Sequence, residues 1–140
     1  MIRPLVGGLF LAFAVSATVS AANLKGSAAV LQGMDKVTAR ISTFDAAIGK
    51  TVRYGELEIV VRACRKRPPE EPPESAAFVE VFEVKKGRER RKVFGGWMFA
   101  SSPALSAMEH PVYDIWVVDC RTAGSGKPKG SGGRKASRSR

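Results

Sequence analysis

A serine, a histidine and an aspartate that follow one another closely are the first residues in this chain that could do chemistry. Ser101, Ser102, His110 and Asp114 fall within 14 residues. A nucleophilic serine needs a base within hydrogen-bond reach and an acid behind that base. No G-x-S-x-G elbow surrounds either serine, and two serines before Pro103 are more typical of a turn. We expect no catalytic residue here and keep an envelope hydrolase with this Ser/His/Asp set as an alternative.

Metal binding is the second chemistry to consider, because carboxylates and an imidazole occur close together. Glu109, His110, Asp114 and Asp119 carry suitable donor atoms. His110 is the single histidine of the chain, and Asp114 and Asp119 would point to opposite faces of one strand. We therefore expect a polar rim at the end of a sheet, with no metal and no cofactor.

The two cysteines, Cys64 and Cys120, indicate a disulfide if the protein is exported. Their separation is far from C-x-x-C spacing, which argues against redox catalysis and against a zinc site. Closing a loop of about 56 residues stabilises a fold by about 4 kcal/mol in the chain-entropy description. The alternative is two buried free thiols.

The N-terminus has the three parts of a secretory signal. Arg3 precedes an apolar run over residues 5–15, and small residues follow up to a cleavage site after Ala21. We therefore expect residues 1–21 to be a signal peptide and the protein to be secreted into the periplasm. Residues 4–22 are also uncharged and just reach membrane-spanning length. An uncleaved leader that anchors the protein to the inner membrane is the alternative.

The net charge of +10 is concentrated at the C-terminus. Residues 122–140 contain six Lys and Arg and no acid, whereas residues 22–121 carry only +3. The tail consists mainly of Gly, Ser, Lys and Arg, and we expect it to be disordered because it has little apolar surface to bury. It is a candidate for binding anionic lipid or another anionic polymer. Nucleic acid is an unlikely partner for an exported protein.

Residues 65–75 form a stiff segment that is rich in proline and glutamate. Four prolines in six residues fix φ and remove amide donors, which favours a polyproline II loop. Among the aromatic residues Trp97, Phe99, Tyr113 and Trp116, we expect Trp97, beside two glycines, to be the most exposed and the others to pack in the core. The predicted interaction surface consists of Pro68, Pro69, Glu70, Glu71, Pro72, Pro73, Glu74 and Trp97.

Alternation of apolar and polar residues with a period of two begins at Lys36. We place a β-domain at residues 36–121 and a linker at residues 22–35. The expected strands cover residues 36–43, 51–64, 78–84, 93–100 and 112–120. Five or six short strands with regular turns predict an all-β fold, a small antiparallel sandwich or barrel.

The same alternation predicts which way individual side chains point. Gly55 is expected to form a bulge within one long strand. Beyond it, Leu57, Ile59 and Val61 should form an apolar face, with Cys64 on the opposite face. In the last strand, Cys120 should share a face with Asp114 and Trp116.

Several strings in residues 52–121 are long and specific. They are Gly55-x-Leu57-x-Ile59, the run Arg62–Glu74, Gly96–Pro103 and Glu109-His110-Pro111-Val112-Tyr113-Asp114-x-Trp116. In these strings the chain resembles the bacterial family of unknown function DUF2155. The resemblance implies an exported, single-domain protein with a cysteine at each end of the motif region, and it implies no activity.

Together these features favour a non-enzymatic binding or scaffolding module of the cell envelope, with an unknown envelope protein as its partner. The Ser/His/Asp hydrolase is one alternative. A binder of polyanions or nucleic acid that acts through the basic tail is the other.

Overall fold

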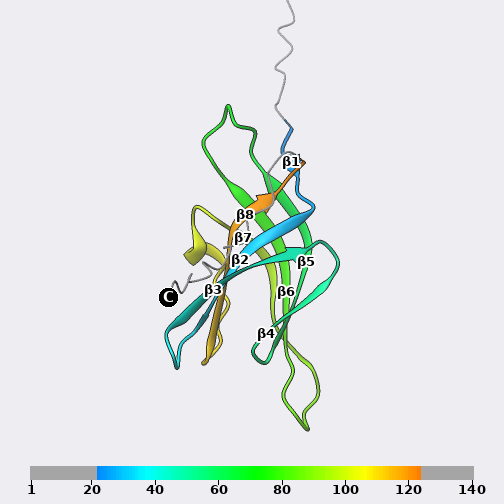
Figure 1. The fold of residues 1–140 in the computed structure, drawn as a ribbon, viewed down its shortest axis with the longest axis vertical. Helices are drawn as coiled ribbons and strands as arrows, with labels where there is room; N and C mark the ends of the chain where they lie inside the picture. The colour runs from blue at the N-terminus through cyan, green and yellow to red at the C-terminus, as the bar shows by residue number, and fades with distance from the viewer. Residues whose placement is uncertain (1–21, 124–140) are drawn as a thin grey trace, which may run out of the picture.

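The computed structural model describes residues 22–123, which form two antiparallel β-sheets packed face to face (Figure 1). The elements are β1 (Leu24–Lys25), β2 (Ala28–Asp35), β3 (Arg40–Ala47), β4 (Thr51–Tyr54), β5 (Leu57–Lys66), β6 (Ser75–Glu83), β7 (Arg91–Phe99), a 3-10 turn η1 (Pro103–Ser106) and β8 (Tyr113–Arg121). The predicted all-β class is confirmed. Nothing helical within residues 22–123 is long and apolar enough to cross a membrane. The predicted signal peptide, and the predicted tail beyond residue 123, lie outside the described residues.

Sheet A contains β5 at its centre and has the order β1-β5-β6-β7. The short strand β4 also pairs with β5, so β1 and β4 share one side of β5 at its two ends. The gap between them is bridged because the Gly26 amide donates to the Cys64 carbonyl and the Gly49 amide to the Val61 carbonyl, both at 2.8 Å. Sheet B has the order β3-β2-β8. Buried aliphatic side chains of both sheets form one core between them.

The prediction that residues 22–35 form a linker is wrong, because β2 lies in this segment as the middle strand of sheet B. Its inward residues include the small Ala29 and Gly33 beside Leu31, so the alternation of apolar and polar residues is weak in the sequence. Gly33 lies against the ring of Tyr54, where an added Cβ would come within 2.7 Å of the ring. The small residue is therefore required by a large neighbour from the other sheet.

Two turns also differ from expectation. The segment 51–64 is not one strand with a bulge at Gly55. It is a hairpin in which Gly55 and Glu56 form the turn between β4 and β5. Gly55 has φ +57°, and its backbone lies against the ring of Tyr113. Similarly, residues 36–39 form the turn before β3, with Ala39 at φ 56°, so that strand starts four residues later than predicted.

Each cysteine reaches the core because one extra residue precedes it in its strand. In β5, the register with β6 shifts between Val61 and Ala63, and Arg62 is the additional residue. In β8, the register with β2 shifts so that Val118 is additional. Each β-bulge reverses the alternation of side chains beyond it. The cysteine two residues later therefore faces inward in both strands.

These bulges overturn the predicted orientation of both cysteines. Cys64 shares the core face with Val61 instead of lying opposite to it, and Cys120 shares the core face with Val117 instead of the face of Asp114. Both cysteines are fully buried and form the predicted disulfide, with Cα atoms 5.8 Å apart. Because Cys64 belongs to sheet A and Cys120 to sheet B, this bond joins the two sheets covalently.

Deletion of Arg62 is expected to prevent the disulfide, because removal of the bulge turns Cys64 to the outside of sheet A. The variant should contain two free thiols and lose about 4 kcal/mol of unfolding free energy. Thiol titration under denaturing conditions and urea unfolding measure the two effects. Arg62→Ala keeps the bulge and should remain fully oxidised. A deletion variant that is oxidised and as stable as wild type would show that the bulge does not orient Cys64.

Candidate functional site

An open hollow of about 670 Å³ lies at the disulfide end of the sandwich. The loop between β5 and β6, which projects at the top of Figure 1, forms one wall. The lining residues are Leu24, Lys66, Arg67, Pro68, Pro69, Glu71, Pro73, Glu74, Ser75, Ala100, Ser101, Val118, Asp119, Thr122 and Ala123. Most of the predicted proline surface therefore borders one cavity.

The proline loop is held in place by its own hydrogen bonds. The Arg67 amide donates to the Glu74 carbonyl at 3.0 Å and so closes the base of the loop. Within the loop, the Glu71 amide donates to the Pro68 carbonyl at 3.1 Å. This bond closes a turn, so the segment is not the continuous polyproline II helix that we expected. Pro68 is buried beneath it. These bonds fix the wall before any ligand arrives.

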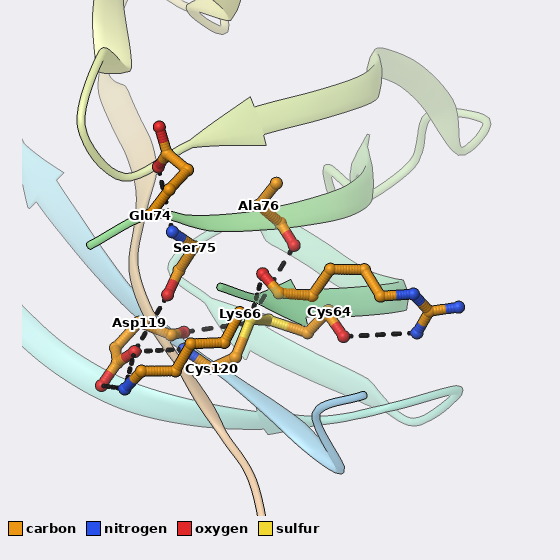
Figure 2. A network of polar contacts seen from close by, with 8 residues as sticks. Cys64, Lys66, Glu74, Ser75, Ala76, Asp119 and Cys120 are labelled. Atoms are coloured by element: carbon orange, nitrogen blue, oxygen red, sulfur yellow. Dashed lines mark hydrogen bonds and ion pairs between the residues drawn. A yellow bond between two sulfur atoms is a disulfide. The ribbon is translucent and has the colours of Figure 1, made fainter. Parts of the chain in front are cut away.

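A second polar network, centred on Asp119, forms the floor of the hollow (Figure 2). The Lys66 ammonium lies 2.8 Å from Oδ1 of Asp119, and the Ser75 hydroxyl donates to the same oxygen at 3.0 Å. The Cys120 amide donates to it at 2.8 Å. Burial alone would raise the pKa of Asp119, but these hydrogen bonds and the charge of Lys66 lower it. Asp119 is therefore ionised and internally paired.

Glu74 ties the loop to the segment that follows β7. Its Oε1 atom accepts hydrogen bonds from the Ser75 amide at 3.0 Å and the Ser101 amide at 3.1 Å, and its Oε2 atom accepts one from the Ser101 hydroxyl. Burial would raise the pKa of Glu74, whereas the three hydrogen bonds lower it. Ser101 consequently positions a loop, and its hydroxyl donates to the Glu74 carboxylate and not to His110.

The exposed groups in the hollow that a ligand could contact include apolar side chains. Leu24 and Val118 keep 40% and 41% of their surface accessible, although both are aliphatic. Val118 is the additional residue of the β8 bulge, and it points outward because Cys120 points inward. Its role as a lining residue could not be seen in the alternation pattern, since that pattern does not contain the bulge.

Trp97 does not lie at this site, so the predicted interaction surface is divided between two places. It lies in β7 and packs edge-to-face against Phe78 of β6, with ring centroids 5.7 Å apart. Its exposed fraction of 40% agrees with the prediction that it is accessible. Trp116 is half-buried and donates from Nε1 to the side chain of Gln32, and Tyr113 packs against His110.

The Ser/His/Asp set is not assembled in this structure. His110 is buried and its Nε2 atom lies 2.6 Å from Oε2 of Glu83. Its Nδ1 atom accepts hydrogen bonds from the amides of Val112 and Tyr113 at 3.1 and 3.2 Å. Nε2 must therefore carry the proton and donate it to Glu83. With both ring nitrogens occupied, His110 has no position from which to accept a serine proton.

Asp114 and Asp119, considered above as metal ligands, are paired with different lysines. Asp114 lies 2.9 Å from the ammonium of Lys36, whereas Asp119 pairs with Lys66. Residues 22–123 contain no group of three or more His, Cys, Asp or Glu side chains arranged to hold a metal ion.

Glu83, which was not among the residues predicted to form a site, organises the opposite end of the sandwich. Besides His110, its carboxylate pairs with Lys85 at 3.0 Å and Arg91 at 3.1 Å. The hydrogen bond from His110, followed by those from Lys85 and Arg91, lowers its pKa to about 2. The available signal was its position on the inward face of β6, in register with Val79 and Val81.

Aromatic rings extend this cluster across the sandwich. Phe44 stacks on Tyr54 at 5.5 Å, Tyr54 meets Tyr113 edge-on at 5.8 Å, and Tyr113 stacks on His110 at 5.4 Å. Burial, and then the charge of Asp35, raises the pKa of Tyr54. This end is closed by rings and one carboxylate, and the open hollow lies at the other end.

Comparison with known proteins identifies relatives but no characterised one. The DUF2155 family model, described as an uncharacterized protein conserved in bacteria, matches residues 29–120. This match starts before the resemblance seen at residues 52–121 and includes most of β2. An uncharacterized protein of Rickettsia prowazekii (strain Madrid E) is 29% identical over 87 residues, which are 62% of this chain and 56% of that protein. The chain thus spans little more than half of its relative's length. No solved structure matches.

Glu83→Gln should lower the unfolding free energy at pH 7 by about 1–3 kcal/mol, because it leaves the buried donor of His110 with a weaker partner. Since the folded-state pKa of Glu83 is about 2, below its ordinary value of 4.5, its contribution is present above pH 4.5 and disappears as the pH falls toward 2. The stability difference between wild type and variant should therefore shrink over that range in urea titrations.

Glu89→Gln, in the exposed β6–β7 turn, is the matched control and should change stability little at any pH. A constant difference between wild type and Glu83→Gln from pH 7 to pH 2 would contradict the assignment of Glu83 as an ionised, paired group.

Proposed function

The chain belongs to the DUF2155 family of uncharacterized bacterial proteins, and on that premise we propose that it is an exported, non-enzymatic binding module of the cell envelope. Its ligand is an extended, apolar segment of a partner protein, which binds in the hollow beside the proline loop. The observation that carries this proposal is the combination of a fixed loop with the exposed side chains of Leu24 and Val118 in one open cavity.

The hollow has the properties of a preformed binding site. Its volume of about 670 Å³ lies within the range of 300–1,000 Å³ that is usual for ligand sites. The loop wall is cross-linked by the hydrogen bonds of Arg67, Glu71 and Glu74, so little conformational entropy would be lost when a ligand binds.

The chemistry of the lining favours apolar contact over catalysis. The carboxylates of Glu74 and Asp119 already accept hydrogen bonds from neighbours, so they add no reactive group to the cavity. Proline rings and the aliphatic side chain of Val118 remain as contact surface. The Arg67–Glu71 pair at the rim, 3.9 Å apart, would orient a segment without dominating its affinity.

Export is the second part of the proposal and is supported by the disulfide. Structural disulfides persist in oxidising compartments and are rare in the cytoplasm. The Cys64–Cys120 bond is fully buried and joins the two sheets, as expected of a structural bond and not of a redox switch. Together with the signal-like residues 1–21, it favours the periplasm, with retention of an uncleaved leader in the inner membrane as the alternative.

A photo-crosslinking amino acid at position 118 should capture a discrete partner in living cells, because this position faces the hollow. The measurement is the appearance of a shifted band that mass spectrometry resolves into this chain and one partner peptide. The same amino acid at position 37 is the matched control, since Val37 is 78% exposed but lies in the β2–β3 turn, away from the hollow. Equal or absent capture at both positions would contradict a binding role for the hollow.

Removal of residues 2–21 should keep the protein in the cytoplasm and leave Cys64 and Cys120 reduced. The full-length protein should be recovered from the cell envelope fraction with no free thiol. Thiol trapping before lysis, followed by intact mass measurement, reads both the redox state and the cleavage site. Two free thiols in the full-length protein at native expression levels would contradict the proposed compartment.

A further inference from the structure

The outer face of sheet A differs in charge from the outer face of sheet B. Strand register, together with the ion pairs of Arg62 and Arg90, places six cations on it: Lys25, Arg53, Arg62, Arg65, Arg90 and Lys92. Among the described strand residues, the anions on this face are Glu58 and Glu80. The outward strand residues of sheet B include three aspartates and a single cation, Arg121. The domain is therefore electrically asymmetric.

Three of these cations form ion pairs with two carboxylates, and the other three form no ion pair with a described residue. Glu80 pairs with Arg62 at 2.7 Å and Lys92 at 2.9 Å, and Glu58 pairs with Arg90 at 3.0 Å. Across residues 22–123, none of the ion pairs includes Lys25, Arg53 or Arg65. A surface with uncompensated guanidinium groups attracts anions, and arginine binds carboxylates with two parallel hydrogen bonds.

Aromatic rings lie among these charges. Trp97 and Phe78 are paired across β6 and β7, in the row next to Arg65, and Trp97 is 40% exposed. Further along the face, the guanidinium of Arg90 lies 3.5 Å above the centre of the Phe82 ring. Gly95, on the same face as Trp97, carries no side chain, and the side chain of Lys92 lies over its backbone. The face therefore offers a stacking surface next to unpaired cations.

From this juxtaposition we infer that the outer face of sheet A binds an acidic polysaccharide. Its carboxylates contact Arg65, Arg53 and Lys25, and one sugar ring packs on the indole of Trp97. Tryptophan suits this role because it combines a large apolar ring with a polar edge. The choice of a sugar polymer over a nucleic acid rests on the proposed export. The site itself is separate from the hollow, because neither Trp97 nor Arg53 lines that cavity.

Fluorescence anisotropy with the purified full-length protein and labelled polygalacturonate tests the inference. We expect binding that is at least about tenfold tighter than to neutral dextran, and that weakens about tenfold when the salt is raised from about 50 to about 300 mM. Polyphosphate supplies charge without rings and should bind more weakly. Oligo-dT supplies both charge and rings, and tighter binding of oligo-dT than of polygalacturonate would overturn the choice of ligand.

Variants separate the contribution of this face to binding from that of the basic C-terminal residues, because every protein tested contains those residues. Trp97→Ala should weaken polygalacturonate binding about tenfold, and Trp97→Phe, which keeps a ring, should restore most of it. Arg65→Gln or Arg53→Gln should each cost about three- to tenfold. Arg40→Gln removes the same charge from the other sheet and should leave binding unchanged.

Affinities equal to that of wild type for Trp97→Ala, Arg65→Gln and Arg53→Gln, or no binding of polygalacturonate at low salt, would overturn the inference. Neither result would contradict the proposed binding role of the hollow, because capture at position 118 depends on different residues. Urea unfolding of Trp97→Ala checks that the variant is folded, and Arg53→Gln, on the short strand β4, provides the test should Trp97→Ala unfold.

Discussion

The covalent bond between the two sheets is the constraint on which this small domain depends. Cys64 and Cys120 belong to different sheets, and each faces the other because a single additional residue precedes it. Without Arg62 and Val118 as bulge residues, strict alternation would point both thiols away from the core. A domain of about 100 residues buries too little surface to be stable by a wide margin, so a cross-link worth about 4 kcal/mol is a large part of its stability.

The same bulge that closes the core also creates the edge of the candidate site. When Cys120 turns inward, Val118 is displaced outward and lines the hollow. Asp119, between them, accepts hydrogen bonds from Lys66 and Ser75, which fixes the base of the proline loop against β8 (Figure 2). Stability and the shape of the cavity therefore depend on the same three consecutive residues. A change that relaxed the cross-link would also move the wall and floor of the hollow.

Sequence patterns predicted the parts of this fold whose physical cause is local. The all-β class, the disulfide partners and the proline loop follow from alternation, from cysteine count and from fixed φ angles. The bulges could not be predicted in this way. An additional residue interrupts the period of two, but it need not be of any particular type, and Arg62 and Val118 are ordinary strand residues. Strand β2 was missed because its inward residue Gly33 has no side chain. The ring of Tyr54, from the other sheet, fills that space. Glu83 was missed because its partner His110 is 27 residues away.

Proximity in the sequence also suggested a catalytic group that the fold separates. Ser101 is bound by Glu74 at the disulfide end, whereas His110 is bound by Glu83 at the aromatic end. Both carboxylates have lowered pKa values because each one accepts several hydrogen bonds, and this stabilises their charged forms. Perturbed carboxylates often indicate catalysis, but here every donor comes from the protein itself, so their charge is used to hold segments in place. On the outer face of sheet A, in contrast, Lys25, Arg53 and Arg65 take part in none of the ion pairs of residues 22–123.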